Sequence, residues 1–239
     1  MNPTFVLGGE LPVRRLGFGA MRILRDPDEG KRVLHRALEL GVNLIDTADV
    51  YGAGRSEELI AEALRPYPDG LVIATKGGIA RGFQDRLRDA RPERLRVACD
   101  ESLRRLKLDR IDLYQLHRHD PAVPIEESVG ALEELRQAGK IRLIGLSNVS
   151  VGQLRRAQAV TRIVSVQNQY NRGLLTSEDV LGVCEAEGIA FFPWEPLGEG
   201  LGEPADELRW LLDRSPVLLP IPGTSRVEHL EANMAAVAD

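Results

Sequence analysis

Short apolar, β-branched runs alternate with longer amphipathic segments along almost the whole chain. The amphipathic segments repeat their apolar positions with helical spacing, as Val33 and Ala37 do. The apolar runs are typical of strands that are buried on both faces. The expected strands are 15–19, 43–48, 71–76, 111–117, 141–148, 164–170, 189–196 and 217–222. The expected helices are 28–40, 56–65, 92–106, 126–138, 151–160, 177–187, 205–214 and 226–236.

Eight strand–helix pairs predict a closed parallel (β/α)8 barrel, the TIM barrel, as a single domain over residues 1–239. A doubly wound open sheet is the alternative, but it needs a glycine-rich turn after the first strand and an acidic residue about 20 positions later. Residues 17–21 match that turn only loosely, and no such acidic residue follows. Gly8 and Gly9 predict a hairpin over residues 5–13, which we expect to close the lower end of the barrel.

Composition and charge narrow the class of protein. The chain has 239 residues, 43% of them hydrophobic, and a formal net charge of −5 from interspersed charges. This balance argues against a nucleic-acid or anionic-membrane surface. The start lacks a basic region before a long apolar stretch and no run reaches transmembrane length, so we expect a cytoplasmic protein. Cys99 and Cys184 are expected to be reduced thiols, and a monomer is expected.

Four polar side chains stand at or just past the ends of predicted strands: Asp46, Tyr51, Lys76 and His117. All strand C-termini of a parallel barrel open onto one face, and that face carries the chemistry. We therefore expect a carboxylate, a phenol, an ammonium and an imidazole at one mouth. This set suits the transfer of a proton to a carbonyl oxygen.

Lys76 and Tyr51 are best interpreted together, because a nearby ammonium changes the acidity of a phenol. A free phenol has a pKa near 10 and is a poor acid at neutral pH. Lys76 is expected to lower the pKa of Tyr51, while Asp46 pairs with Lys76 and fixes its position. Taken singly, Tyr51 is explained as well by an aromatic residue packed on the rim. A solvated strand end explains Lys76 less well, because Lys76 ends an apolar run and precedes Gly77 and Gly78.

The histidine leaves a second kind of site open. A lone strand-end histidine such as His117 is more often structural than catalytic, but its three partners favour a functional role. His119 would place its ring on the same side of a strand as His117, as in barrel hydrolases that bind metal. The other histidines, His35 and His229, lie in predicted helices, so a metal would depend on carboxylates. We expect no metal, and a metal-dependent hydrolase is the less favoured alternative.

Seven segments, in order along nearly the whole chain, resemble the aldo-keto reductase family. The resemblance implies a (β/α)8 reductase that binds a nicotinamide cofactor without a Rossmann domain. It implies that Tyr51 is the general acid, that Lys76 and Asp46 lower its pKa, and that His117 orients the carbonyl group. A non-catalytic cofactor-binding or regulatory barrel is the main alternative. The segments are 16–21, 46–52, 74–78, 109–117, 144–148, 167–171 and 220–225.

The same resemblance assigns contacts to the cofactor. Ser147, Asn148 and Gln167 match residues that hold the nicotinamide carboxamide, and Trp194 falls where an aromatic side chain stacks on the ring. Glu195 stands where family members have a small hydroxyl residue, and its charge opposes a pyrophosphate. Further contacts are implied at Gly19, Ala20, Met21, Asp46, Pro196, Leu197 and Gly198.

The start of the last predicted helix is expected to bind the adenosine end. Backbone amides there, together with Arg226, favour an anion such as a 2′-phosphate. The resemblance therefore implies NADPH rather than NADH. The implied contacts are Gly223, Thr224, Ser225, Arg226, His229 and Asn233.

The chain is shorter than is usual in the family. The loops after Lys76 and Gly198 are trimmed, and the chain ends directly after the last predicted helix. Fewer lid segments predict an open pocket with weak selectivity for its small-molecule carbonyl substrate. The expected pocket residues are Met21, Ile23, Tyr51, Phe83, His117, Arg118 and Trp194.

Overall fold

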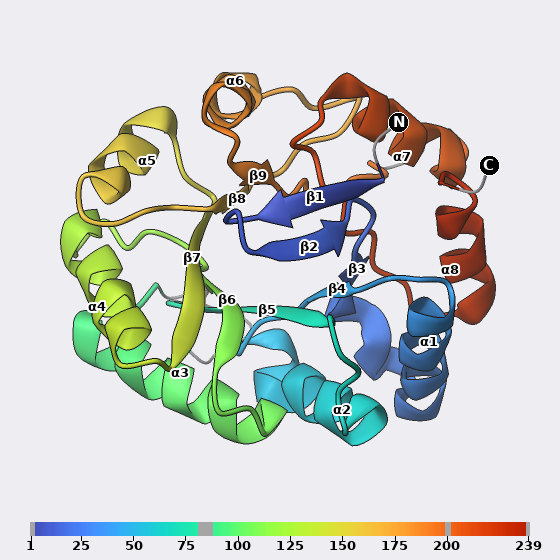
Figure 1. The fold of residues 1–239 in the computed structure, drawn as a ribbon, viewed down its shortest axis with the longest axis horizontal. Coiled ribbons are helices and arrows are strands. Elements are labelled where there is room, and N and C mark those ends of the chain that lie inside the picture. The colour runs from blue at the N-terminus through green and yellow to red at the C-terminus, as the bar shows by residue number, and fades with distance from the viewer. Residues whose placement is uncertain (1–2, 81–87, 199–201, 238–239) are drawn as a thin grey trace.

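Seven parallel strands form one curved sheet and pair in the order in which they occur along the chain (Figure 1). The computed structural model describes residues 3–80, 88–198 and 202–237. Every described strand of this sheet lies within or beside a run that the sequence predicted to be a strand. The strands are β3 (Phe18–Gly19), β4 (Leu44–Asp46), β5 (Val72–Gly77), β6 (Ile111–Leu116), β7 (Ile141–Ser147), β8 (Ser165–Gln167) and β9 (Ala190–Phe191).

Residues 217–222 close the sheet into a barrel. On one side, the amide of Leu219 donates to the carbonyl of Phe191 in β9 at 2.8 Å. On the other side, the amide of Gly17, just before β3, donates to the carbonyl of Pro220 at 3.0 Å. Pro220 and Pro222 have no N–H group, so these two positions accept hydrogen bonds from Gly17 and Gly19 but donate none, and the segment does not form a regular strand. The predicted (β/α)8 TIM barrel is confirmed, with its eighth strand reduced to an irregular segment.

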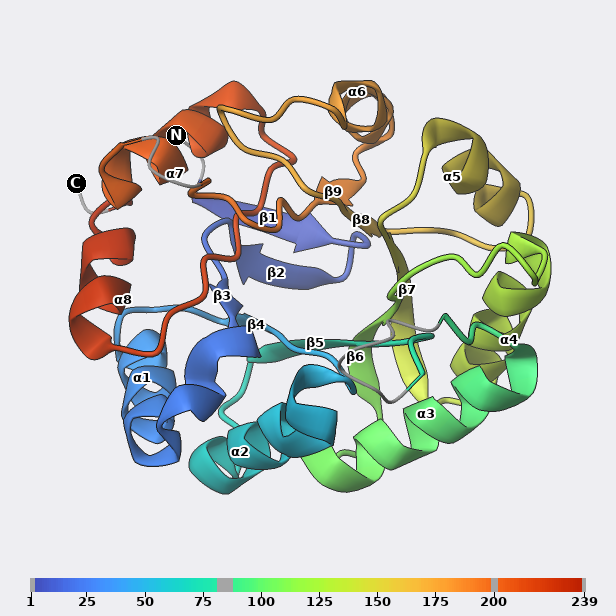
Figure 2. The ribbon, with the colours of Figure 1, turned by 180° about the vertical axis from the view of Figure 1, so that it is seen from behind.

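Helices surround the barrel, as both ribbon views show (Figures 1 and 2). The side chain of Asp26 accepts two backbone hydrogen bonds at the start of the first helix, whose first residue is Pro27. Cys99 and Cys184 are free and buried in separate helices. No helix in the described ranges is long and apolar enough to cross a bilayer. The helices are α1 (Pro27–Glu39), α2 (Arg55–Leu64), α3 (Pro92–Leu106), α4 (Ile125–Gln137), α5 (Val151–Gln158), α6 (Glu178–Glu187), α7 (Pro204–Arg214) and α8 (Val227–Met234), with short 3₁₀ helices η1 (Ala20–Arg25) and η2 (Tyr51–Gly54).

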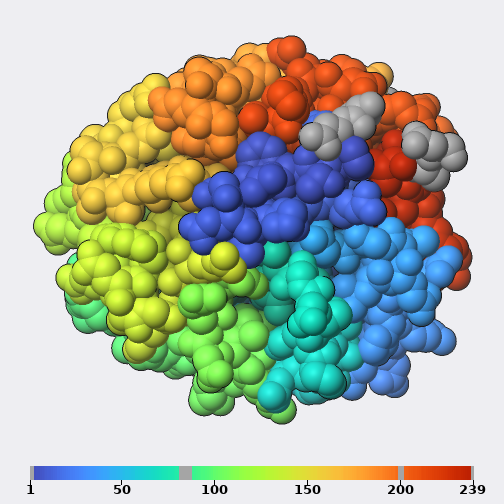
Figure 3. Space-filling model, in the orientation of Figure 1, coloured from blue at the N-terminus to red at the C-terminus, as the bar shows by residue number. Residues whose placement is uncertain are grey.

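An antiparallel hairpin closes one end of the barrel, as the sequence predicted. Its strands are β1 (Thr4–Leu7) and β2 (Leu11–Arg14). Leu7 and Val13 have no exposed surface and share a core with Leu143, which belongs to a barrel strand. Figure 1 shows the hairpin lying across the barrel, and the space-filling view in Figure 3 shows it covering the centre of that face. The chemistry is therefore confined to the opposite end.

We predict that Leu7→Ala destabilises the protein by about 2–5 kcal/mol, because it leaves a cavity at the closed end of the barrel. Val6 precedes Leu7 in the same strand but is 51% exposed, so Val6→Ala serves as the matched control with little effect. Urea unfolding of both variants measures the difference. Equal stability of the two variants would show that the hairpin does not pack into the barrel.

Candidate active site

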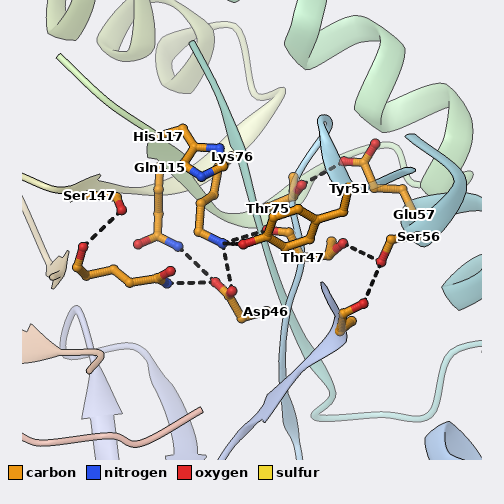
Figure 4. A network of polar contacts seen from close by, with 12 residues as sticks. Asp46, Thr47, Tyr51, Ser56, Glu57, Thr75, Lys76, Gln115, His117 and Ser147 are labelled. Atoms are coloured by element: carbon orange, nitrogen blue, oxygen red, sulfur yellow. Dashed lines mark hydrogen bonds and ion pairs between the residues drawn. The ribbon is translucent and has the colours of Figure 1, made fainter. Parts of the chain in front are cut away.

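Three of the four predicted side chains meet around one ammonium group. Lys76, near the end of β5, donates to Asp46 Oδ2 at 2.6 Å and to the carbonyl oxygen of Thr47 at 2.8 Å. Its third hydrogen bond reaches Tyr51 Oη at 3.5 Å (Figure 4). Asp46 ends β4 and Tyr51 begins η2. The structure thus gives all three protons of the Lys76 ammonium an acceptor.

The ammonium is fully buried yet remains charged. Burial alone would lower the pKa of Lys76, but Asp46 and Tyr51 outweigh it and raise the pKa above its ordinary value. The second carboxylate oxygen of Asp46 accepts hydrogen bonds from Gln167 Nε2 at 2.9 Å and from Gln115 Nε2 at 3.2 Å. Both amides hold the carboxylate in the orientation that serves Lys76.

The phenol of Tyr51 is a weaker acid than the sequence suggested. Burial raises its pKa, and Lys76 lowers it only part of the way back toward the ordinary value. Asp46 adds a smaller upward contribution. The direction of the Lys76 effect is as expected, but the net shift is upward because the phenol is desolvated. Tyr51 therefore holds its proton at neutral pH.

His117 lies beside Tyr51, directly after β6 (Figure 4). The two rings meet edge to face with centroids 6.1 Å apart, and the His117 amide donates to the carbonyl of Gly77 at 2.8 Å. Burial, then the charges of Lys76 and Arg118, hold the pKa of His117 well below its ordinary value. The imidazole is therefore neutral at pH 7 and offers one N–H donor. Its Nδ1 is buried with no hydrogen-bond partner among the described residues.

The residues expected to hold a nicotinamide form a connected network next to this cluster. Asn148 takes a left-handed backbone, with φ of +57°. Its amide donates to Ser147 Oγ at 2.9 Å and to the carbonyl of His117 at 3.2 Å, and it accepts from Trp194 Nε1 at 3.1 Å. Ser147 donates in turn to the carbonyl of Gln167 at 2.9 Å. The sequence placed these residues together but did not predict the Trp194–Asn148 hydrogen bond.

The loop after β9 is tied down by polar contacts. Glu195, with φ of +55°, accepts a hydrogen bond from Gln169, and its carbonyl accepts one from Asn171 at 3.0 Å. Leu197 packs into a small apolar cluster that includes Leu16. Gln169 thus engages the carboxylate of Glu195 on the loop expected to follow a pyrophosphate. The other predicted contacts of this loop are Pro196 and Gly198.

Two glycines bring backbone segments together near the predicted adenosine end. A Cβ on Gly19 would lie 2.7 Å from the carbonyl oxygen of Ile221, and one on Gly223 would lie 2.7 Å from the carbonyl oxygen of Gly19. Only glycine permits this approach at both positions. The sequence predicts cofactor contacts for both glycines, and the structure adds this packing role.

Two backbone amides at the start of α8 already donate hydrogen bonds to side chains of the protein. Thr224 Oγ1 accepts from the amide of Arg226 at 3.1 Å, and Glu29 accepts from the amide of Val227 at 3.2 Å. The amide of Val227, the first residue of α8, therefore already has a carboxylate partner. Asn233 is buried, whereas Ser225 is only partly buried and His229 is exposed.

A cavity of about 510 Å³ opens beside Asn148 and Trp194, which both line it. Of the expected pocket residues, Arg118 and Trp194 line it, whereas Tyr51, His117 and Met21 are not among its lining residues. Met21, in η1, is 56% exposed. The expectation for Ile23 is wrong: its side chain has no exposed surface and lies in the main core. Phe83 lies outside the described residues. The lining residues are Arg118, Asn148, Val149, Ser150, Asn168, Gln169, Thr176, Ser177, Asp179, Val180 and Trp194.

Sequence analysis missed a second buried polar cluster, which is hydrogen-bonded to Thr75, the residue before Lys76. Glu57 and Arg105 are both buried and form an ion pair at 2.6 Å. Asp49 is 4% exposed and its Oδ1 has no hydrogen-bond partner among the described residues. Burial and then the charge of Glu57 raise the pKa of Asp49 to about 7, against the opposing charge of Arg105. Helical periodicity marks Glu57 as inward-facing, but no local signal identifies its partner.

Asp49→Asn is predicted to stabilise the protein above pH 7. The folded protein holds a proton on Asp49 that the unfolded chain releases between about pH 4 and 7, so this group lowers the wild-type free energy of unfolding as pH rises through that window. The loss is on the order of 3 kcal/mol and is absent from the variant. Urea unfolding of both proteins at pH 4.5 and pH 8 checks this. A variant that gains no stability over the wild type between those pH values would contradict it.

Comparison with known proteins identifies the family. A family model described as "Aldo/keto reductase family" matches residues 15–207. The chain is 44% identical over 254 residues to an uncharacterized oxidoreductase of Schizosaccharomyces pombe, covering 95% of this chain and 83% of that protein. It is 40% identical over 264 residues to pyridoxine 4-dehydrogenase of Escherichia coli, covering 98% and 92%.

A solved structure agrees with these sequence relatives. An aldo-keto reductase from Klebsiella pneumoniae in complex with NADPH superposes with a TM-score of 0.84 at 26% identity, covering 99% of this chain and 90% of that one. This structural match indicates the same family as the sequence matches, and the solved structure contains a nicotinamide cofactor. The chain is an NAD(P)H-dependent oxidoreductase and belongs to the aldo/keto reductase family.

Proposed function

We propose that this protein reduces an aldehyde or ketone to an alcohol with NADPH, and that Tyr51 supplies the proton. The observation that carries this proposal is the buried Lys76 ammonium, which donates to both Asp46 and Tyr51. A phenol against a fixed positive charge is a proton donor whose conjugate base is stabilised where it forms. A structural lysine would not need a buried phenol as its third acceptor.

The bound cofactor would supply the hydride, and the residues present suit its nicotinamide end. A carboxamide both donates and accepts hydrogen bonds, and Ser147, Asn148 and Gln167 offer groups of both kinds. The buried Oε1 of Gln115 has no partner among the described residues, which leaves an acceptor facing the same region. Trp194 would give the ring an aromatic face. The Asn148 Oδ1 accepts one hydrogen bond from Trp194 Nε1, and an amide oxygen can accept a second.

The chain's own residues would then move one proton. The carbonyl oxygen accepts hydrogen bonds from Tyr51 Oη and from the neutral imidazole of His117. As negative charge builds on that oxygen, the Tyr51 proton transfers to it, which completes the alcohol and leaves a phenolate. Lys76 stabilises the phenolate, and Asp46 keeps Lys76 in place. Each group acts in the protonation state that its surroundings favour.

The cavity beside Trp194 is the proposed site for the rest of the substrate. Its lining is largely polar and carries one cation, Arg118, and one anion, Asp179. The short connection between β9 and α7 leaves few lid segments for the family's barrel. We infer broad acceptance of small carbonyl compounds with polar groups.

Tyr51→Phe is expected to lower kcat for NADPH-dependent carbonyl reduction by about 10²–10⁴-fold, because the proton donor is removed. The assay is NADPH oxidation against a panel of aldehydes, quinones and dicarbonyls. Tyr67→Phe is the matched control, since the Tyr67 phenol donates to the carbonyl of Leu106 at 2.7 Å away from the site. Full activity in Tyr51→Phe would reject the mechanism. Tight NADPH binding with no turnover of any carbonyl would favour a regulatory protein.

The preference for NADPH is proposed to depend on Arg226. We expect Arg226→Ala to weaken NADPH binding about 10-fold or more while leaving NADH binding unchanged, because a charge-assisted contact to the 2′-phosphate is lost. Quenching of tryptophan fluorescence gives both dissociation constants. Arg209→Ala, on the exposed face of α7, is the control. Equal losses for the two cofactors would place the 2′-phosphate elsewhere.

A further inference from the structure

The turn that carries Tyr51 has an unfavourable backbone. Gly52, Ala53 and Gly54 are consecutive residues with φ of +57°, +55° and +94°. Glycine adopts this region freely, but Ala53 does so only at a cost. Such a conformation persists where the surrounding structure holds it in place. The contacts on either side of the turn therefore decide where the Tyr51 phenol lies.

The chain before the turn is fastened to β5. The amide of Thr47 donates to the carbonyl of Ala74 at 2.8 Å, and the amide of Asp49 donates to the carbonyl of Lys76 at 3.1 Å. These bonds continue the pairing of β4 with β5 beyond its last regular pair. The strand that carries the ammonium thus also holds the entry to the turn.

The chain after the turn is fastened by buried side chains at the start of α2. Ser56 Oγ accepts a hydrogen bond from Thr47 at 2.9 Å and donates to the carbonyl of Ala20 at 3.0 Å. Glu57 has no exposed surface and accepts from Thr75 Oγ1 at 2.6 Å. Figure 4 shows Ser56 and Glu57 on the other side of Tyr51 from Asp46. Thr75 directly precedes Lys76, so this hydrogen bond attaches the start of α2 to the strand that carries the ammonium.

Arg105 of α3 binds the other oxygen of the Glu57 carboxylate. Its Nε donates to Glu57 Oε2 at 2.6 Å, and its side chain is 2% exposed. A Cβ on Gly54 would lie 2.6 Å from Arg105 Cδ, so the arginine packs directly on the turn. A buried ion pair adds little stability over a well-packed apolar pair, because both charges must be desolvated. Its more specific effect here is to fix α2, α3 and β5 around the turn.

We propose that Glu57, held by Arg105 and Thr75, is a positioning residue that keeps the Tyr51 phenol beside Lys76. The proposal rests on the proposed role of Tyr51 as proton donor. Glu57 does not touch the phenol, and it acts through the strained turn between them. Removing its carboxylate frees one end of that turn, while Asp46, Lys76 and the nicotinamide network keep their contacts.

The kinetic test compares Glu57→Gln with the wild type as holoenzyme, using NADPH and a small aldehyde. Glutamine keeps the size of the side chain but not its charge. We expect kcat to fall about 10- to 100-fold, because a displacement near 1 Å of a reacting group costs that much. The KM for the aldehyde and the Kd for NADPH should change less than about 2-fold, because the contacts that bind the aldehyde and the cofactor in the ground state are not affected.

Three further variants separate the positioning role from simple misfolding. Thr75→Val keeps the shape of the side chain and removes only its donor to Glu57, so kcat should fall several-fold, whereas Thr75→Ser retains the donor and should restore it. Arg15 is also buried and donates to the carbonyl of Leu212 at 2.8 Å, away from the turn. Arg15→Met should lower the melting temperature without lowering kcat of the folded enzyme.

A fall in kcat for Glu57→Gln and Thr75→Val, absent from Thr75→Ser and Arg15→Met, supports the proposal. If Glu57→Gln does not fold, the two Thr75 variants decide, and an unchanged kcat in Thr75→Val overturns the proposal. If the wild type reduces no carbonyl, the proposed function fails instead. Crystal structures then decide the positioning role: the Tyr51 Oη–Lys76 Nζ separation of 3.5 Å should lengthen in Thr75→Val, and an unchanged separation overturns the proposal.

Discussion

A fully buried ammonium group imposes the main constraint on the open end of this barrel. Taking a charge out of water costs several kcal/mol unless neighbouring groups replace the lost hydration. Lys76 obtains that replacement from Asp46, from the carbonyl of Thr47 and from Tyr51. All three acceptors lie within residues 46–51, so the ammonium requires the end of β4 and the turn after it to keep a fixed position relative to β5.

The barrel satisfies this constraint with a closed end and an open end. The hairpin fills the closed end with apolar side chains, including Leu7 and Val13. At the open end, inward-facing polar groups take over, and Gln115 and Gln167 orient the carboxylate that pairs with the ammonium. Burial there leaves the phenol protonated and the imidazole of His117 neutral. The same desolvation that makes the site costly thus prepares two donors for a carbonyl oxygen.

Features that depend on chain-local rules were predictable from the sequence. Strand periodicity and the parallel barrel bring Asp46, Lys76 and His117 to one end, and Gly8 with Gly9 indicates the hairpin. The eighth strand was expected to be regular, but its prolines, Pro220 among them, remove the donors that a ladder needs.

Features that depend on distant partners were not predictable. Ile23 was expected in the pocket, yet η1 turns it into the core. The contacts of Glu57 with Arg105, and of Asn148 with Trp194, join residues 48 and 46 positions apart. No periodicity encodes such pairs, and only the packed structure reveals them.

The most direct test of the proposed chemistry is a crystal structure of the protein with NADP⁺ and an inhibitor that carries a carbonyl or carboxylate oxygen. We expect this oxygen to lie within about 2.6–3.2 Å of both Tyr51 Oη and a ring nitrogen of His117. We also expect Lys76 to retain its bonds to Asp46 and Tyr51. An oxygen bound away from Tyr51, with the nicotinamide directed elsewhere, would contradict the role of Tyr51 as proton donor.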